Sequence, residues 1–433
     1  MKYLMIENSG EADVRAFTIF GLSTARGNSD LIGQFGSGSK HAINVMLRHN
    51  IDCYIYSGTN KFEFTTEQNI MNGSIYNQVF IKENQSKRRE AGWALEFGSQ
   101  DWTHISMGLR EFISNAIDAC GSENVNIEVT DKPRAKSNKT RIFVEYTSEV
   151  EVYFKNINHY FLHWGPNKDK KFIPNTENTQ ANIYRKGVLV GKLQAYQPCS
   201  LFHYNLDDEL VIDESRNIND WQCSVACAKA LSKDRYAIET LCSSLLQDRN
   251  VWEHSFNKHN LEGDGEIWKE SWNKVAGDKV ICDDAMKSMQ LTSKGIQSVI
   301  IKKLDMFAAL AGHGIVSSNN KLSPLEQRGH NVVDTSKEAK STLDRVWGWL
   351  NDIEMTGGKN KPDIKCFSSV DDGHHLFGYY EDETVFMNIC DDSNTQTMLE
   401  ECSHYVTGAE DNSRIFQEFA FNVANRMAKI LFD

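Results

Sequence analysis

Apolar and polar positions alternate through the first part of the chain in a way that predicts short strands and three helices. Residues 2–6 form an apolar run that ends in turn-forming residues at 8–10, and a helix is expected from about Asp13. A second helix is expected where the glycine-rich stretch 21–39 runs into the apolar-periodic segment 42–47. A third is predicted over Ser106–Cys120, because its apolar residues recur with helical spacing. Segments rich in β-branched and aromatic residues predict an antiparallel sheet at Cys53–Tyr56, Lys61–Thr65, Tyr76–Lys82 and Trp93–Phe97, with further strands at Val125–Val129 and Arg141–Tyr146.

The rest of the chain changes from a mixed pattern to a mainly helical one. Residues 150–245 contain strand-like segments, a polar loop at Asn167–Asn182 and a helix near Asp220–Leu231. A helical tract runs from Lys258 to about Gly314, and a polar connector continues through Asn331. A final unit combines a helix, strands at Phe377–Tyr380 and Thr384–Ile389, and a long helix. We therefore expect an α+β protein with three domains, at 1–148, 149–250 and 251–433.

Composition narrows the class of protein. The 433 residues suffice for two or three domains, and 47 basic against 59 acidic side chains give a net charge of −12. Such a charge disfavours nonspecific binding of nucleic acid, which needs clustered Lys and Arg. No apolar run is long enough for a membrane span or a secretory signal, so a cytoplasmic protein is expected. The ten cysteines lack paired metal spacing, which favours reduced and mostly buried thiols.

Three polar residues share one face of the predicted helix Ser106–Cys120. Glu111, Asn115 and Asp118 are spaced by four and three, and they lie opposite the apolar stripe. An Asn carbonyl oxygen can join the oxygen ligands of Mg²⁺, and a neighbouring carboxylate can orient and deprotonate an attacking water. A solvated polar face on an amphipathic helix is the alternative, and spacing alone favours it.

The sequence of this helix resembles a known ATP-binding motif. LREFISNAIDA (109–119) is similar to the N-box LRELISNASDA of the ninety-kilodalton heat-shock chaperones and to the same helix of the gyrase and mismatch-repair ATPases. These proteins form the GHKL, or Bergerat-fold, superfamily. The resemblance implies that Glu111 is the general base, that Asn115 is a Mg²⁺ ligand and that Asp118 supports the nucleotide site.

A glycine-rich loop provides a second, independent match. Glycine permits positive φ and close approach of the backbone to phosphates, whose oxygens the amides of a loop and a helix start can bind, although an ordinary loop has the same composition. LIGQFGSG (31–38) resembles LIGQFGVG, the lid and phosphate-binding motif of the chaperones, and GLSTARGN (21–28) resembles the adjoining lid segment. The resemblance implies nucleotide contacts from Ser23, Thr24, Gly33, Gln34, Phe35, Gly36, Ser37, Gly38 and Lys40.

The start of the chain departs from the family pattern. Asn8 and Gly10 stand where the superfamily has Asp-x-Gly-x-Gly, whose aspartate binds the adenine amino group, and Ala12 replaces the second glycine. Asn8 keeps an acceptor oxygen for that hydrogen bond, and Glu7 is the alternative adenine ligand.

The order of the motifs is also unusual, because the adenine and glycine motifs precede the N-box. We therefore expect a circularly permuted Bergerat α/β sandwich over residues 1–148, for which the phage rIIA-type ATP-binding proteins are a loose comparison.

In GHKL proteins a transducer domain of βαβ type lends a basic residue to the γ-phosphate. VIDESRN (211–217) resembles the chaperone segment LNISRE, which nominates Arg216 for this role, with Lys186 and Lys192 as less specific candidates. A surface ion pair between Arg216 and a neighbouring carboxylate explains the segment equally well.

The C-terminal region resembles the edge strand and active helix of zincin metalloproteases. Strand-like TVFMNI (384–389) precedes MLEECSHYVTG (398–408), where zincins read His-Glu-x-x-His. Glu400 replaces the first histidine and His404 retains the second, with Asp411 or Glu418 as a conceivable third ligand. One imidazole with carboxylates is a poor Zn²⁺ site, so a degenerate, structural zincin-like domain is favoured over a working protease.

The leading functional hypothesis is an ATP-driven conformational switch that uses Mg-ATP and hydrolyses it. Dimerisation on ATP fits the superfamily, and an unidentified protein partner, from a phage or its host, is expected. Two alternatives remain open. One is a nucleotide-sensing module without turnover that acts on such a partner through the C-terminal half, and the other is an ATP-regulated metallopeptidase.

Overall fold

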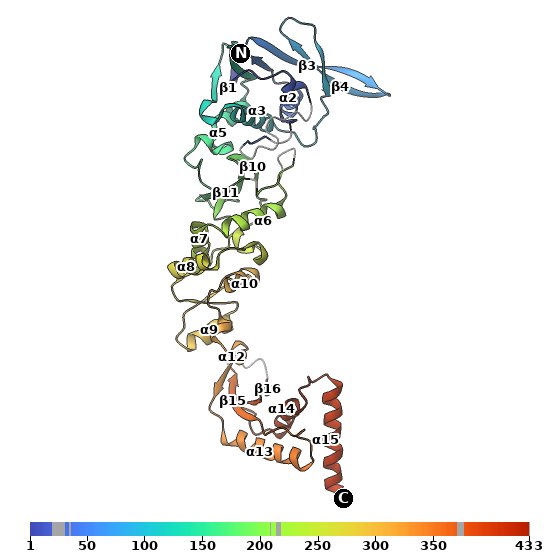
Figure 1. Cartoon of the computed structure of the whole chain (residues 1–433), viewed down its shortest axis with the longest axis vertical. Coiled ribbons are helices and arrows are strands. Elements are labelled where there is room, and N and C mark those ends of the chain that lie inside the picture. Colours follow the sequence, from blue (N-terminus) through green and yellow to red (C-terminus); the bar gives the residue numbers. More distant parts are fainter. Residues whose placement is uncertain (20–30, 34–35, 208, 214–217, 370–375, 433) are drawn as a thin grey trace. The chain divides into compact units, whose positions relative to one another are not determined.

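The computed structural model describes residues 1–19, 31–33, 36–207, 209–213, 218–369 and 376–432, and the remaining residues lie outside this description. The chain divides into two compact units, Met1–Asp264 and Gly265–Asp433. Helices and sheets occur in both units, so the chain is α+β as predicted (Figure 1). The predicted regions 1–148 and 149–250 both fall inside the first unit.

The largest sheet of the described residues is a seven-stranded antiparallel sheet in the first unit. Its strand order is β5-β4-β3-β2-β7-β1-β6, and every neighbouring pair is antiparallel. The predicted antiparallel sheet is therefore confirmed, but the strand expected at Trp93–Phe97 lies earlier, at Arg89–Ala94, and residues 95–97 form a turn. The strands are β1 (Tyr3–Ser9), β2 (Cys53–Ser57), β3 (Asn60–Met71), β4 (Ser74–Glu83), β5 (Arg89–Ala94), β6 (Asn126–Thr130) and β7 (Lys139–Glu145).

Strand β1 is longer than the sequence predicts and lies between β6 and β7. Asn8 and Ser9, which were expected in a turn, instead pair with Thr140 and Lys139 of β7. The chain turns at Gly10, whose φ of 89° is in the region that favours glycine, and its N–H donates to the carbonyl of Asn138. The first residues of the chain are thus held between strands formed more than a hundred residues later.

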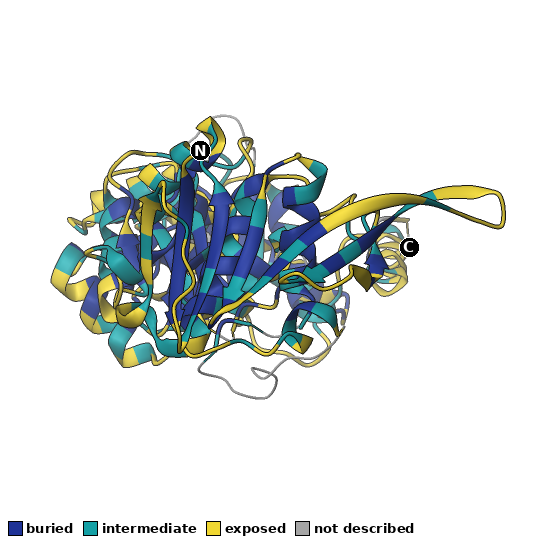
Figure 2. Ribbon diagram, turned by 90° about the horizontal axis from the view of Figure 1, so that it is seen from above, coloured by how far each residue is buried: buried dark blue, intermediate teal, exposed yellow. Residues whose placement is uncertain are grey.

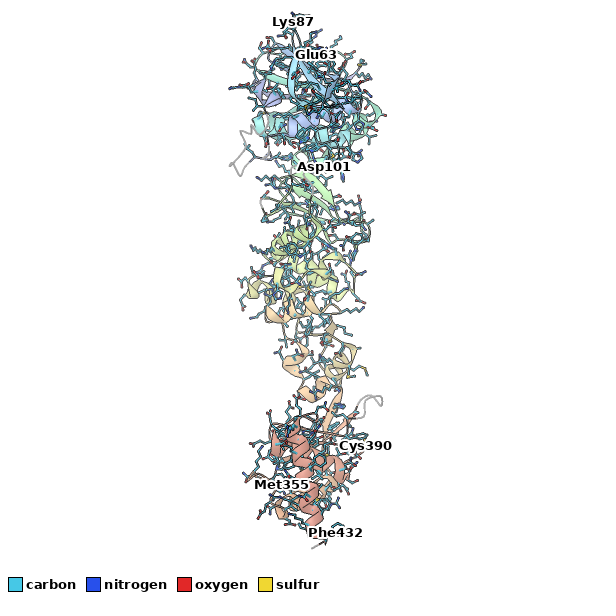
Figure 3. The ribbon with its side chains drawn as sticks, turned by 90° about the vertical axis from the view of Figure 1, so that its right-hand side faces the viewer. Glu63, Lys87, Asp101, Met355, Cys390 and Phe432 are labelled. Carbon is cyan, nitrogen blue, oxygen red and sulfur yellow. The ribbon has the colours of Figure 1, made fainter. Side chains whose placement is uncertain are left out.

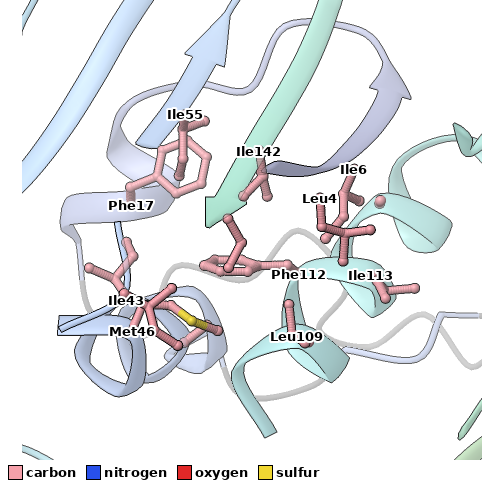
Figure 4. Packing of buried hydrophobic residues seen from close by; sticks show 14 of the residues in the cluster. Leu4, Ile6, Phe17, Ile43, Met46, Ile55, Leu109, Phe112, Ile113 and Ile142 are labelled. Atoms are coloured by element: carbon pink, nitrogen blue, oxygen red, sulfur yellow. The ribbon is translucent and has the colours of Figure 1, made fainter. Parts of the chain in front are cut away.

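Two helices cover one face of this sheet. Helices α2 (Gly38–Arg48) and α3 (Ile105–Cys120) bury apolar residues against Leu4, Ile6 and Ile142 of the central strands (Figure 4). The helix expected from Asp13 is only the single turn α1 (Arg15–Thr18). The 3₁₀ helix η1 (Ser122–Asn124) follows α3, and α4 (Ser148–Lys155), α5 (Ile157–Tyr160) and η2 (Leu162–Trp164) follow the sheet.

The hairpin of β3 and β4 extends well beyond its neighbours in the sheet. Figure 2 shows its outer part exposed, in contrast to the buried inner strands. Ile70 and Ile75 face each other across this tip and are 73% and 64% exposed.

The second part of the first unit holds a four-stranded sheet of order β10-β9-β11-β8. Its strands β9 and β11 are parallel, but the chain between them passes through β10 rather than a helix, so these strands do not form the predicted βαβ unit. The reason is a tight turn, because Lys186 and Gly187 both have positive φ and fold β10 back onto β9. The elements are β8 (Phe172–Pro174), which lies inside the predicted polar loop, β9 (Asn182–Arg185), β10 (Val188–Lys192), β11 (Phe202–Leu206), α6 (Asp220–Leu231), α7 (Arg235–Leu246), η3 (Trp252–Ser255) and η4 (Lys258–Asn260).

The second unit begins with helices that alternate with two short strands. Strands β12 (Val280–Cys282) and β13 (Ser298–Ile300) pair in parallel, so the helical tract predicted to about Gly314 is interrupted by two strands that the sequence did not predict. Both strands have only three residues, which is too short for their period of two to stand out from the helical pattern around them. The helices are α8 (Gly265–Ala276), α9 (Ala285–Ser293), α10 (Leu304–Gly312), α11 (Ser318–Lys321) and α12 (Pro324–Gln327).

The end of the second unit is a four-stranded sheet of order β14-β15-β17-β16 with three helices. The predicted edge strand TVFMNI contains β17, which pairs on both sides. The edges of this sheet are β14 and β16, so this detail of the prediction is wrong. Cys390 and Phe432 lie on the surface of this unit (Figure 3). The elements are β14 (His330–Val333), α13 (Lys337–Asp352), β15 (Asp363–Ser369), β16 (Gly378–Glu381), β17 (Thr384–Asn388), α14 (Thr395–Thr407) and α15 (Arg414–Phe432).

Among the described helices, none is both long enough and apolar enough to cross a bilayer.

Candidate functional site

The polar face of α3 is covered by protein. Glu111 is only 4% exposed, and Asn115 and Asp118 are half-buried. The opposite stripe, which includes Leu109 and Phe112, enters the core as predicted. The interpretation of this face as an ordinary solvated surface is therefore wrong, because the segment that leads into α2 lies against it.

Asp118 binds the start of the glycine loop. Its Oδ1 accepts a hydrogen bond from the backbone N–H of Ile32, and its Oδ2 accepts one from Gly33, each at 2.7 Å. Hydrogen bonds to a charged acceptor are roughly twice as strong as neutral ones. One carboxylate thus fixes two successive backbone amides that lie 86 and 85 residues away in the sequence.

Asn115 and Glu111 contact the first turn of α2. The Asn115 side-chain amide donates from Nδ2 to Ser39 Oγ at 3.0 Å, which leaves Oδ1 as its acceptor atom. Gly38 lies so close to Glu111 that an added Cβ would collide with the Glu111 carboxylate. Glycine at 38 therefore permits α2 to begin directly above the acidic residue of α3.

The start of α2 offers a favourable environment for an anion. The helix has no acidic residue of its own in its first turn, and the Glu111 carboxylate of α3, which lies beside Gly38, offsets part of the positive end of its dipole. Lys40 is 1% exposed, and its ammonium donates to the carbonyls of Ala16 at 2.8 Å and Gly36 at 2.9 Å. Burial lowers the pKa of Lys40 to about 8. The glycine loop is thus tied to α1 by a buried cation.

The two adenine-ligand candidates lie on opposite faces of β1. Successive side chains of a strand alternate, and Asn8 shares the helix-covered face with Leu4 and Ile6. Its register partner Thr140 is also buried, and the Thr140 hydroxyl donates to Gly10 O at 2.9 Å. Asn8 and Thr140 therefore place polar groups at one end of an otherwise apolar face.

Glu7 points to the other face and has ionic partners there. It pairs with Arg141 at 2.6 Å and Lys136 at 3.3 Å, with Lys139 nearby at 3.6 Å. Burial alone would raise the pKa of this carboxyl, but the hydrogen bonds and charges of Arg141 and Lys136 lower it below its usual value. Of the two candidates, only Asn8 faces the helices.

The two nominated lysines of the second region lie in different surroundings. Lys186, in the β9–β10 turn, donates from Nζ to the carbonyl of Leu31 at 3.0 Å and thus reaches the glycine loop. Lys192 instead lines a groove of about 310 Å³, together with His159, His203 and Glu177. Arg216, Ser23, Thr24, Gln34 and Phe35 lie outside the described residues.

Sequence reasoning missed two contributors to this region. Ser39 directly follows the matched glycine motif, and Thr140 is the second residue of an unremarkable strand. Neither residue type is distinctive, and only the pairing of β7 with β1 brings Thr140 beside Asn8. No local sequence signal could have identified them.

A second group of ligand-type side chains lies in the C-terminal unit. Glu400 and His404 of α14 and Asp411 after it place one ligand atom each within 4.8 Å of one another. His404 Nε2 lies 2.7 Å from Asp411 Oδ1. Glu418, the other predicted third ligand, instead pairs with Arg414 at 2.7 Å.

The chain matches no model of a known protein family and no curated protein sequence.

Proposed function

We propose that the first unit binds Mg-ATP beside α3 and hydrolyses it, as an ATP-driven conformational switch. One observation carries this proposal: the polar face of α3 is buried against a glycine-containing segment, with which it makes specific hydrogen bonds. Burial of acidic and amide groups is unfavourable unless they are paired or functional. Their convergence on a loop and helix start suited to phosphate supports a nucleotide site over a structural helix.

Each group in the site has a chemical task in this proposal. The first turn of α2 and the glycine loop bind phosphate oxygens through backbone amides. Glu111 orients and deprotonates the attacking water, since it is the buried carboxylate at the start of α2. Asn8 receives the adenine amino group, with Thr140 at its side.

The amide of Asn115 fits a Mg²⁺ ligand. The Asn115 side-chain nitrogen donates a hydrogen bond to Ser39, which leaves the side-chain carbonyl oxygen to bind a metal ion. Mg²⁺ prefers oxygen ligands and usually shares them with phosphates. When bound there, Mg²⁺ would neutralise and orient the phosphate oxygens.

The proposed switch rests on contacts from two parts of the unit to one loop. Asp118 holds the amides of Ile32 and Gly33, while Lys186 holds the carbonyl of Leu31. A change in this loop on nucleotide binding or hydrolysis would therefore alter both α3 and the β9–β10 turn. That coupling gives the 149–250 region a route to sense the nucleotide, as expected of a transducer.

The test is titration of the full chain with ATP and Mg²⁺, with phosphate release followed in parallel. Glu111→Gln keeps the size of the side chain and is expected to lower turnover by at least about 100-fold with little change in affinity. Asn115→Ala is expected to weaken binding of ATP in Mg²⁺ but not in EDTA. The matched control is Glu123→Gln, an exposed carboxylate after α3, which should change neither quantity.

The outcomes separate the hypotheses. Tight binding with no turnover in the native chain favours a nucleotide-sensing module, and absence of binding refutes the proposal. Sedimentation with and without a non-hydrolysable ATP analogue tests the proposed dimerisation on nucleotide.

A further inference from the structure

The connection between α14 and α15 folds back onto His404. Gly408 ends α14 with a φ of 64°, and its N–H donates to the carbonyl of His404. This left-handed residue reverses the chain, so the carbonyl of Ala409 and the carboxylate of Asp411 both reach the imidazole. Glu400, one helical turn before His404, completes the group.

The hydrogen bonds of His404 fix which ring nitrogen carries the proton. Nδ1 lies 2.6 Å from the carbonyl oxygen of Ala409, and a carbonyl oxygen only accepts, so Nδ1 must donate. In a neutral imidazole, Nε2 is then an acceptor. Yet Nε2 lies 2.7 Å from Asp411 Oδ1, which is an acceptor as well. A proton or a cation must therefore lie between them: a second proton on the ring, a proton on the carboxyl group, or a metal ion.

Three features favour a metal ion over a proton. A proton satisfies one Nε2–carboxylate pair, whereas a carboxylate oxygen of Glu400 also lies within 4.8 Å of the other two ligand atoms. The ring is also held in place by stacking on Phe416, with centroids 4.1 Å apart and planes 11° apart. Metal-binding histidines characteristically donate their other ring nitrogen to a backbone carbonyl, which orients the ring as it is oriented here.

We propose that Glu400, His404 and Asp411 bind a divalent transition-metal ion, with water completing its coordination. An imidazole with two carboxylates binds Zn²⁺ less tightly than the two-histidine site of the zincins, but its nitrogen ligand still favours Zn²⁺ or Mn²⁺ over Mg²⁺ and Ca²⁺, which prefer sites made only of oxygen. Ligand atoms on one tetrahedral Zn²⁺ lie about 3.4 Å apart, so Asp411 must move slightly from Nε2. Its side chain is 71% exposed and can do so, and the open site gives the ion access.

The ion has a structural task in this proposal. Two of its ligands belong to α14 and the third belongs to the segment that leads into α15. Binding therefore joins the end of α14 to the start of α15, which otherwise meet there through the His404–Phe416 stack and the contacts of the intervening turn.

The experiment measures Zn²⁺ binding to the full chain by calorimetry, without nucleotide and with excess Mg²⁺ to occupy magnesium sites. Asp411→Asn, an exposed change that leaves the fold intact, is expected to weaken the tightest Zn²⁺ site by at least about 100-fold. His404→Gln should abolish that site. Glu410→Gln is the matched control, because it removes the same charge one residue away and should leave Zn²⁺ affinity unchanged.

A second measurement locates the effect. Zn²⁺ is expected to slow amide hydrogen exchange over residues 408–416 in the native chain and in Glu410→Gln, but not in Asp411→Asn. Equal Zn²⁺ affinity in all four proteins, or no binding to the native chain, would overturn the proposal and leave an imidazolium–carboxylate pair. Neither result bears on the nucleotide site, which has separate residues.

Discussion

Replacement of Asp118 by Asn tests whether α3 holds the glycine loop. The change keeps the shape of the side chain but exchanges one carboxylate oxygen for an amide nitrogen. The native carboxylate accepts from two backbone amides at 2.7 Å each. In Asp118→Asn one amide meets a neutral acceptor, and the other faces a donor and loses its partner.

The magnitude follows from these two bonds. A hydrogen bond to a charged group contributes about 1.5–3 kcal/mol, a neutral one about 0.5–1.5 kcal/mol, and an unpaired amide is unfavourable by about 1–3 kcal/mol. We expect the local opening free energy of the loop to fall by about 2–4 kcal/mol. That corresponds to faster hydrogen exchange at Ile32 and Gly33 by about 30- to 700-fold.

Hydrogen exchange resolved at these amides is the suitable assay, because a chain of two compact units need not unfold in one transition. Glu151→Gln is the control, since it removes an exposed i,i+4 pair with Lys155 worth at most about 0.5 kcal/mol. Unchanged exchange at Ile32 and Gly33 in Asp118→Asn would refute the reasoning, because the loop would then be held by other contacts. ATP affinity should fall in the same variant if the loop binds phosphate.

Three further predictions concern the same region. The pKa of Lys40 is about 8 in the folded protein, below its usual 10.5, so loss of the proton favours the folded state. The thermal midpoint should therefore rise between pH 8 and pH 10.5, and Lys40→Met should flatten that rise. Gly38→Ala should lower stability by about 1–3 kcal/mol through overpacking, whereas Gly348→Ala, in α13 with open space around it, should raise stability by up to about 1 kcal/mol in the same melting assay. Lys186→Met should weaken ATP binding in calorimetry, and Lys192→Met, in the separate groove, should not.

Helix α3 and most strands of the seven-stranded sheet were predictable because their patterns are long and strong. The stripe of α3 repeats over four turns, and the strands of the seven-stranded sheet carry β-branched and aromatic residues between turns. Strands β12 and β13 have three residues each, which is too short for a strand pattern to be recognised in the sequence. Pairing with another strand in the folded protein, rather than local sequence preference, determines whether such a short segment forms a strand.

The site was only partly predictable, for a different reason. Spacing placed Glu111, Asn115 and Asp118 on one face, but it could not say that another segment covers that face. Likewise, alternation could not choose between Glu7 and Asn8 until β1 was placed between β6 and β7. Asp411 reaches His404 only through the reversal at Gly408. In each case the missing information is a contact between segments.

The placement of β1 also constrains how the proposed site can form. Asn8 and the glycine loop come from the first forty residues, whereas Glu111 and Thr140 come from residues that follow the hairpin of β3 and β4. Because β1 is paired on both sides by β6 and β7, the two halves of the site assemble only when these late strands close around the first one. Such long-range pairing makes loop closure a precondition for the site. A truncated chain that ends before β7 is therefore expected to lose the whole nucleotide site and not only Thr140, although it retains the glycine loop and α3.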